Sequence, residues 1–288
     1  MKKITIGGVP EHFNLPWHMA IENNKFKDKH IDLQWKEFPG GTGAMCSALR
    51  VGSIDAAVIL TEGIIKDIIA GNPSKIVKTY VDSPLLWGIH VAESSKFNSV
   101  QELKNAKIAI SRPGSGSQLM AKVNAVKQGF NVDQLKYVLV KNLNGGVNAL
   151  SDGSADYFMW EHFMTKPYVD NGTFRRLDSL ETPWPCFVIA VRNNILKEEP
   201  EAIKRMIKVI NKQLKHFENP LENDKLITHF SERYQLKVED VKTWLSLTKW
   251  NRKKTVSKKL INSIQNKLTD YDVIKENVPA KVLIKKMF

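Results

Sequence analysis

The sequence predicts an α/β protein built from two similar, doubly wound α/β lobes, joined by a two-strand hinge and followed by a helical C-terminal extension. Three observations support this prediction. Short strand and helix patterns alternate through residues 2–194. The octapeptide at 48–55, ALRVGSID, returns 101 residues later at 149–156 as ALSDGSAD, with five of eight positions identical. From about Glu198 onward, strand patterns stop and apolar residues follow helical spacing.

The first lobe is predicted from strands and helices of ordinary length. Apolar residues at every second position, or in short unbroken runs, indicate strands, and apolar residues three and four apart indicate helices. The expected strands are 2–9, 31–38, 56–61, 75–81 and 87–92, and the expected helices are 15–24, 42–52 and 63–71. This alternation indicates a parallel sheet that is covered on both faces.

The second lobe repeats this order. Its expected strands are 105–111, 135–140 and 156–160, and its expected helices are 115–129 and 145–153. We expect the strand at 184–194 to carry the chain back to the first lobe, so that two crossings form a hinge. The expected domains are 1–90 as the N-terminal part of lobe I, 91–185 as lobe II, and 186–288 as the return strand and the C-terminal helices that complete lobe I.

The C-terminal segment reads as four amphipathic helices. Their expected ranges are 201–217, 221–234, 238–250 and 257–268. Because no further strands accompany them, we expect these helices to cover a sheet that the earlier segments have already formed.

Composition narrows the classes of function. The net charge is +13, but the densest basic cluster, 249–259, contains no nucleic-acid-binding motif, and we interpret it as a solvated helix surface. Cys46 and Cys186 lack metal-binding spacing and are expected to be buried apolar groups. The histidines show no HxH or HxxxH pair, so neither a metal nor another cofactor is expected. No apolar run is long enough to span a membrane.

The loops after the predicted strands are the candidate ligand-binding segments, because open α/β sheets bind ligands at the carboxyl ends of their strands. The first lobe contributes polar groups, a glycine-rich loop and a threonine expected to cap the next helix. These candidate residues are His12, Asn14, Gly41, Thr42, Gly43, Thr61 and Glu62.

The second lobe contributes hydroxyl groups and a helix N-terminus, which together favour an anion. The loop SRPGSGS is neither a P-loop, because Gln118 stands where that motif needs lysine or a hydroxyl residue, nor a GxGxxG fingerprint. Indole rings near the strand ends are expected to form an aromatic wall for a ring ligand. These candidate residues are Ser111, Gly114, Ser115, Ser117, Asn142, Trp160, Glu161 and Trp184.

These segments resemble the type II periplasmic-binding-protein family. The opening at 4–38, the helix-to-strand turn at 48–58 and the segment 99–117 are similar to the substrate-binding proteins of nitrate, sulfonate and taurine transporters and to their thiamine-pyrimidine relatives. The motifs VPEHFNLP, FPGGTG and LTEG look closest to a subgroup without obvious export signals that also occurs in yeasts. The resemblance covers about residues 3–194.

The resemblance implies a solute-binding protein and favours this function over an enzyme. The protein is expected to close its lobes on a small polar or anionic ligand, which can contain a heteroaromatic ring. The alternative is a cytoplasmic enzyme of the thiamine-pyrimidine or menaquinone-pathway type that uses a cleft histidine such as His12 as a base. The expected partners are the small-molecule ligand and, if the protein is exported, an ABC permease, without nucleic acid, and we expect a monomer. Since MKKITIGG contains no signal-peptide pattern, a cytoplasmic location is expected, with a periplasmic one as the alternative for a trimmed mature form.

Overall fold

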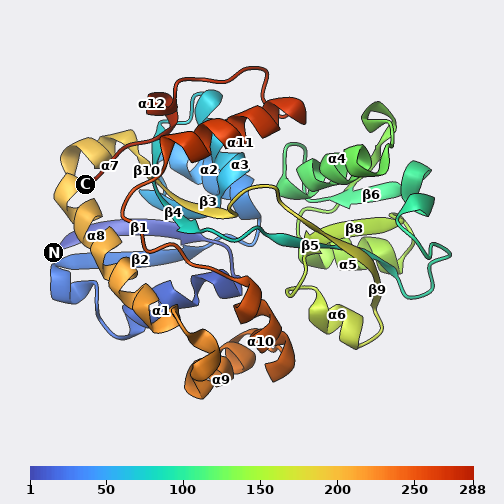
Figure 1. The fold of residues 1–288 in the computed structure, drawn as a ribbon, viewed down its shortest axis with the longest axis horizontal. Helices are drawn as coiled ribbons and strands as arrows, with labels where there is room; N and C mark the ends of the chain where they lie inside the picture. The colour runs from blue at the N-terminus through green and yellow to red at the C-terminus, as the bar shows by residue number, and fades with distance from the viewer. The chain divides into compact units, whose positions relative to one another are not determined.

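The chain folds into two compact units in the computed structural model, which describes residues 1–288 (Figure 1). Unit 1 comprises Met1–Ser83 and Trp184–Phe288, and unit 2 comprises Pro84–Pro183. The chain therefore passes between the units twice. None of the helices combines the length and the apolar character that crossing a membrane requires.

Unit 1 contains a five-stranded sheet in the order β2-β1-β3-β10-β4. The strands are β1 (Lys2–Gly8), β2 (Ile31–Glu37), β3 (Ala56–Leu60), β4 (Ser74–Val81) and β10 (Phe187–Arg192). Strand β1 runs parallel to β2 and β3, whereas β10 runs antiparallel to β3 and β4. The expected return of the chain to the first sheet is confirmed. The expectation of a purely parallel sheet is wrong, because the returning strand enters in the opposite direction.

Unit 2 contains a second five-stranded sheet in the order β7-β6-β8-β5-β9. Its strands are β5 (Leu86–Ala92), β6 (Lys107–Ile110), β7 (Lys136–Leu139), β8 (Tyr157–Glu161) and β9 (Phe174–Glu181). Strand β6 is parallel to β7 and β8, and β5 is antiparallel to β8 and β9, so the plan of unit 1 is repeated strand for strand. Because β5 lies inside this sheet, unit 2 begins before the expected boundary at residue 90.

Helices flank both sheets. Unit 1 contains α1 (Leu15–Glu22), α2 (Gly41–Val51), α3 (Thr61–Ile69), α7 (Asn193–Glu198), α8 (Pro200–Gln213), α9 (Asp224–Tyr234), α10 (Val238–Leu247), α11 (Lys258–Asp270) and α12 (Ala280–Leu283), with short 3-10 turns η1 (His12–Asn14), η2 (Lys27–Lys29), η5 (Leu214–Phe217) and η6 (Pro220–Glu222). Unit 2 contains α4 (Gly116–Gln128), α5 (Leu143–Ser151) and α6 (Lys166–Asp170), with η3 (Gln101–Asn105) and η4 (Val132–Gln134). The predicted C-terminal helices are confirmed.

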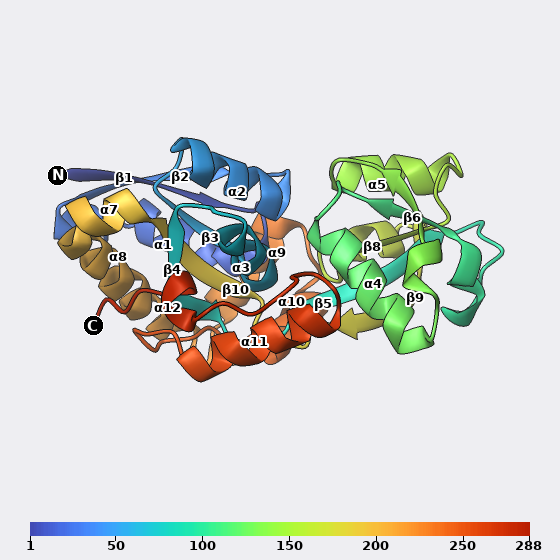
Figure 2. The same cartoon turned by 90° about the horizontal axis from the view of Figure 1, so that it is seen from above.

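The C-terminal helices complete unit 1. Helix α8 packs against α1, α9 packs against α10, and α11 and α12 lie beside α3 (Figure 2). Helix α8 buries Ala202, Ile203, Met206, Ile207 and Ile210, which recur at the spacing of one helical face. Neither cysteine forms a disulfide, and both are buried, as the sequence predicts.

The repeated octapeptides form the same corner in both units. Helix α2 ends at Gly52 with a φ of +77°, and the turn after α5 uses Gly153 with a φ of +75°. Residues with a side chain rarely adopt this left-handed backbone conformation, whereas glycine adopts it without a steric cost. The shared glycine is therefore explained by the helix ending.

The shared aspartate clamps the neighbouring parallel strand. The Asp55 carboxylate accepts a hydrogen bond from the Thr5 amide at 2.8 Å, and the Asp55 amide donates to the Thr5 carbonyl at 2.8 Å. In unit 2, the Asp156 carboxylate accepts from the Lys107 amide at 2.6 Å, and its amide donates to the Lys107 carbonyl at 2.8 Å. The repeat is thus a structural corner that fixes the start of β3 on β1 and of β8 on β6.

Candidate ligand-binding site

The polar strand-end loops of unit 1 lie at the edge where β1 and β3 end. Because parallel strands end at the same edge of a sheet, the segments that follow them are brought together there. The candidate residues in unit 1 are His12, Asn14, Gly41, Thr42, Gly43, Thr61, Glu62 and Trp184, and their surroundings differ strongly.

His12 and Asn14 are both fully buried, with exposed fractions of 0%. The His12 ring stacks on Phe13 at 4.9 Å and meets the edge of Trp244 at 4.1 Å, and burial lowers the pKa of His12 to about 3. The Asn14 Nδ2 group donates to the Val9 carbonyl at 2.8 Å. Both side chains therefore pack within the loop that Trp244 of α10 covers, and their ligand role stays a prediction. The burial of the ring and its lowered pKa also make His12 a weak base.

The TEG segment was expected to be a loop. In the structure it forms the first turn of α3. The Thr61 hydroxyl donates to the Pro185 carbonyl at 2.7 Å, so it ties α3 to the segment that precedes β10. In the glycine-rich segment FPGGTG, Gly41 and Gly43 lie in the first turn of α2. Gly41 has a φ of +68°, which explains the glycine at that position.

Two buried oxygen atoms near the end of β3 have no hydrogen-bond partner in the protein. Thr42 lies inside α2 and does not cap it, contrary to expectation, and its Oγ1 is unpartnered. Its methyl group lies so close to Gly63 that an added Cβ there would come within 2.3 Å. Glu62 is 2% exposed, and its Oε2 accepts from Trp184 Nε1 at 2.8 Å while its Oε1 is unpartnered.

Burial raises the pKa of Glu62 to about 7. Near neutral pH this carboxyl group is present in both protonation states, so it can accept a hydrogen bond or donate one. Buried polar atoms without partners are rare in folded proteins. The Thr42 and Glu62 oxygens, together with the buried and unpartnered Asn14 Oδ1, are therefore the ligand-receptive oxygen atoms at this edge of unit 1.

The serine loop of unit 2 forms a compact network at the N-terminus of α4. Ser115 caps this helix, since its Oγ accepts from the Gln118 amide at 3.3 Å. The Ser117 Oγ lies 3.0 Å from the Ser115 Oγ and accepts from the Ser111 amide at 3.0 Å. Gly114 has a φ of +74°, and its amide donates to the Gln118 Oε1 at 2.6 Å. The structure brings these four candidates together, but their groups largely bond to one another.

Asn142 follows the end of β7, and Trp160 lies near the end of β8 in unit 2. Asn142 caps α5, because its Oδ1 accepts from the Gly145 amide at 3.0 Å. Trp160 is half-buried, and its ring stacks on Phe158 with 5.2 Å between centroids. Trp160 is therefore the candidate ring in unit 2 with a partly exposed surface.

Glu161 stabilises a turn. It is 3% exposed, and its Oε2 accepts from the Phe163 amide at 2.8 Å and from the Met164 amide at 2.6 Å. Because these amides lie in the turn that follows β8, Glu161 has a structural role there, and its ligand role stays a prediction.

Unit 2 contains a polar network that was not predicted from the sequence. Arg176, on β9, donates from Nε to His90 Nε2 at 3.2 Å and lies with Nη1 at 2.7 Å from His162 Nε2. Because a guanidinium group has only donors, both ring nitrogens must accept and both histidines are neutral. Burial, followed by the Arg176 charge, lowers the pKa of His90 to about 3 and of His162 to about 4. No local pattern signalled this network, because its three side chains come from β5, the turn after β8 and β9.

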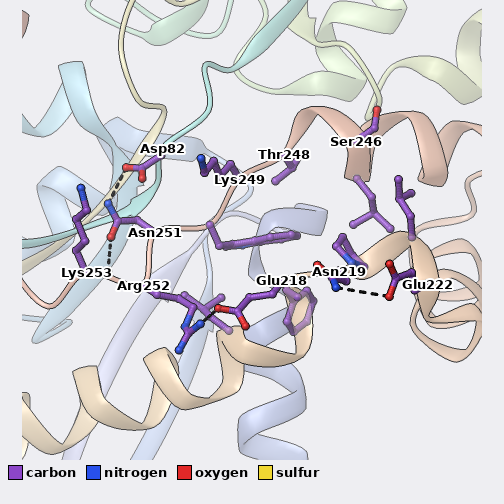
Figure 3. Close-up of a pocket in the computed structure, with 16 residues that line it drawn as sticks. Asp82, Glu218, Asn219, Glu222, Ser246, Thr248, Lys249, Asn251, Arg252 and Lys253 are labelled. Carbon is purple, nitrogen blue, oxygen red and sulfur yellow. Dashed lines mark hydrogen bonds and ion pairs between the residues drawn. The ribbon is translucent and has the colours of Figure 1, made fainter.

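Unit 1 also contains a cavity of about 820 Å³ that the sequence did not predict (Figure 3). Its walls come from η5, η6, the end of α10 and the segment 248–253. Its three carboxylates are paired with other lining groups, through the ion pair between Arg252 and Glu218, the 2.7 Å hydrogen bond from Asn251 Nδ2 to Asp82 Oδ1 and the hydrogen bond from Asn219 to Glu222. Because these carboxylates already have partners, the cavity offers weaker polar recognition than the end of β3.

The basic cluster 249–259 is not the helix surface that was expected. Most of it connects α10 to α11, and its Trp250 and Asn251 are buried. The ammonium group of Lys78, which is fully buried, donates to the Asn251 carbonyl at 2.5 Å and to the Lys253 carbonyl at 2.7 Å. Tertiary contacts with β4 therefore fix this segment.

Comparisons with known proteins support the two-lobe α/β fold. Residues 87–180 match the family model described as Ca3427-like PBP. The Candida albicans CA3427 gene product, described as having the generic periplasmic binding protein fold, is 25% identical, with a TM-score of 0.89 over 99% of this chain and 97% of that chain. A search of curated proteins found no match.

Two bacterial binding proteins share the fold at lower identity. The alkanesulfonate-binding protein SsuA from Xanthomonas axonopodis pv. citri, bound to MOPS, is 16% identical, with a TM-score of 0.81 over 99% of each chain. The periplasmic nitrate-binding protein NrtA from Synechocystis PCC 6803 is 15% identical, with a TM-score of 0.70 over 98% of this chain and 84% of that chain. The chain therefore has the type II periplasmic-binding-protein fold, and its likeness to the Ca3427-like subgroup is supported by both the family model and the Candida albicans structure.

Proposed function

We propose that this protein is a solute-binding protein that closes its two units on a small polar ligand. The fold likeness to sulfonate- and nitrate-binding proteins supports the general class. The single observation that carries the proposal further is the pair of buried, unpartnered oxygens of Thr42 and Glu62. A ligand that bonds to both atoms would remove the cost of leaving them desolvated without a partner.

The Glu62 environment favours a ligand with a nitrogen-bound hydrogen. A simple oxyanion would be repelled by Glu62 whenever this carboxyl group is ionised, whereas an amino-substituted heteroaromatic ring can donate to Oε1. Within the polar and anionic ligands that the fold accommodates, we therefore favour a nitrogen heteroaromatic compound.

Thermal unfolding with three probes tests this choice. We expect 4-aminopyrimidine to stabilise the protein more than MOPS or nitrate, since a ligand at one hundred times its Kd adds about 2.7 kcal/mol. Glu62→Gln and Thr42→Val should each weaken that binding by roughly 1 to 3 kcal/mol. The exposed Glu232→Gln on α9 is the matched control and should leave the affinity unchanged.

Native mass spectrometry of the purified protein identifies any molecule that remains bound. A retained compound that is released chemically unchanged supports the binding function. Recovery of a changed compound would contradict it and indicate an enzyme. If MOPS or nitrate stabilised the protein and 4-aminopyrimidine did not, the heteroaromatic choice would be wrong while the solute-binding class would stand.

A further inference from the structure

A basic groove lies in unit 1 on the side opposite to the strand-end loops. It has a volume of about 490 Å³. We call it the basic groove, and its lining residues are Lys25, Asp28, Lys29, Arg205, Lys208, Val209, Lys212, Gln213 and His216. The segment that contains Lys25 and Lys29 leads into the first residue of β2, at the amino end of the parallel strands. The groove is therefore separate from the candidate site at the carboxyl ends.

The helix α8 presents one face to this groove. Arg205, Lys208 and Lys212 are separated by three and four residues, which places them on the same side of the helix. Lys25 and Lys29 approach from the connection between α1 and β2. Five permanently basic side chains thus surround a concave space that contains a single carboxylate, Asp28.

The positive charges of the basic groove form no ion pair within the protein. No ion pair or side-chain hydrogen bond joins Lys25, Lys29, Arg205, Lys208 or Lys212 to another group in residues 1–288. The carboxylates at the start of α8 are already in use, because Glu199 pairs with Lys2 and Glu201 with Lys204.

Arg205 provides an independent observation. Its Nε is buried and has no hydrogen-bond partner, although it lies in the lining of the groove. A guanidinium nitrogen that is withdrawn from water normally donates to an acceptor. Like charges one helical turn apart also repel each other, so an anion in the groove would relieve two unfavourable contributions at once.

We propose that the basic groove binds a small anion that carries several phosphate charges. Arg205 and Lys212 are seven residues apart, which corresponds to roughly 10 Å along an α-helix. A single phosphate is shorter than this distance, whereas a chain of two or three phosphates spans it. The volume of the groove lies within the range of small-molecule sites. Arginine and lysine supply the charge-assisted hydrogen bonds that phosphate oxygens accept.

Calorimetric titration with inorganic tripolyphosphate tests the proposal, with inorganic phosphate at the same ionic strength as the reference. We expect tripolyphosphate to bind at least about tenfold more tightly, and its affinity to fall as salt is added. The variant Lys208→Gln with Lys212→Gln should weaken binding by about tenfold or more. The control variant Lys258→Gln with Lys259→Gln removes the same charge from the exposed start of α11 and should weaken it by less than about threefold.

Urea unfolding without anion verifies that both variants are folded. Equal weakening in the two variants would overturn the proposal, because net charge alone would then explain the binding. Absence of tripolyphosphate binding to the wild-type protein would also overturn it. Binding of a single-stranded oligonucleotide without binding of tripolyphosphate would replace it with a nucleic-acid surface. These outcomes are independent of Glu62 and of the proposed ligand.

Discussion

Unit 1 leaves the Glu62 Oε1 at the end of β3 without a partner, whereas in unit 2 the Glu161 carboxylate at the end of β8 accepts from two backbone amides. Both glutamates are buried, and both stand at the end of the third parallel strand in the same strand order. The difference shows that a repeated framework does not repeat the chemistry at its edge. One acid stabilises a turn, and the other holds an atom available for a ligand.

The hydroxyl groups of the two units differ in the same way. In unit 2, Ser115 caps α4 and bonds to Ser117, while in unit 1 the Thr42 hydroxyl has no partner. The serine loop looks more like a binding motif in the sequence, but its groups already satisfy one another. Partnering, more than residue type, therefore separates structural polar groups from ligand-receptive ones.

The largest effect expected from this comparison is a pH-dependent one at Glu62. The pKa of Glu62 is raised from 4.5 to about 7, so between these values the native state binds more protons than the unfolded state. The stability of the wild-type protein from this group therefore falls as pH rises, by on the order of 3 kcal/mol over the interval. Glu62→Gln removes this loss, so its stability relative to the wild type should rise from pH 4.5 to 7 and then level off.

Urea unfolding across this pH range measures the effect. Glu161→Gln is the matched variant in unit 2, and at pH 7 it should destabilise the protein by about 1 to 3 kcal/mol because charge-assisted bonds to two amides are weakened. If Glu62→Gln showed no pH-dependent gain, the contrast between the two glutamates would be wrong.

An intermediate effect is expected at the clamp that the units share. Asp55→Ala and Asp156→Ala should each lower the free energy of unfolding by about 2 kcal/mol, because each leaves a strand amide without its charged acceptor. Hydrogen exchange should accelerate in β1 for the first variant and in β6 for the second. Asp133→Ala in η4 serves as an exposed control. A large loss in only one unit would contradict the equivalence of the two corners.

The smallest effects on stability are expected at the two hydroxyl groups. Ser115→Ala should cost about 1 kcal/mol, since it removes the cap of α4. Thr42→Val should change the stability by less than about 0.5 kcal/mol, because its hydroxyl has no bond to lose. Thermal unfolding without ligand compares the two variants. An equal cost in both would indicate that the Thr42 hydroxyl has a partner.

Local signals predicted most of the framework. Alternating apolar residues or short apolar runs located β1, β3, β6 and β8, and the helical spacing of 201–217 located α8 and η5. Strand β9 was not predicted, because its sequence FRRLDSLE contains many charged residues and few apolar ones. Its strand conformation depends on pairing with β5, which is distant in the sequence. The antiparallel direction of β10 could not be predicted from the local sequence either, because a strand pattern does not specify which strands flank it.

The candidate site was predicted less well, for a reason that His12 and Glu62 illustrate. Both appear in the sequence as polar residues after a strand. Helix α10 supplies Trp244 and buries the His12 ring, while Trp184 binds one oxygen of Glu62 and leaves the other without a partner. These contacts join residues more than one hundred positions apart, so no local pattern distinguishes the two environments.

The sequence by itself determined the two-lobe α/β framework, the repeated corner and the helical extension, because these features depend on apolar periodicity and turn glycines. Only the tertiary structure decided which polar atoms are satisfied, how α8 gathers five basic side chains with the α1–β2 connection, and how Lys78 fixes the segment 249–253. The physical reason is that the energy of a buried polar or charged group depends on partners that folding brings from distant parts of the chain.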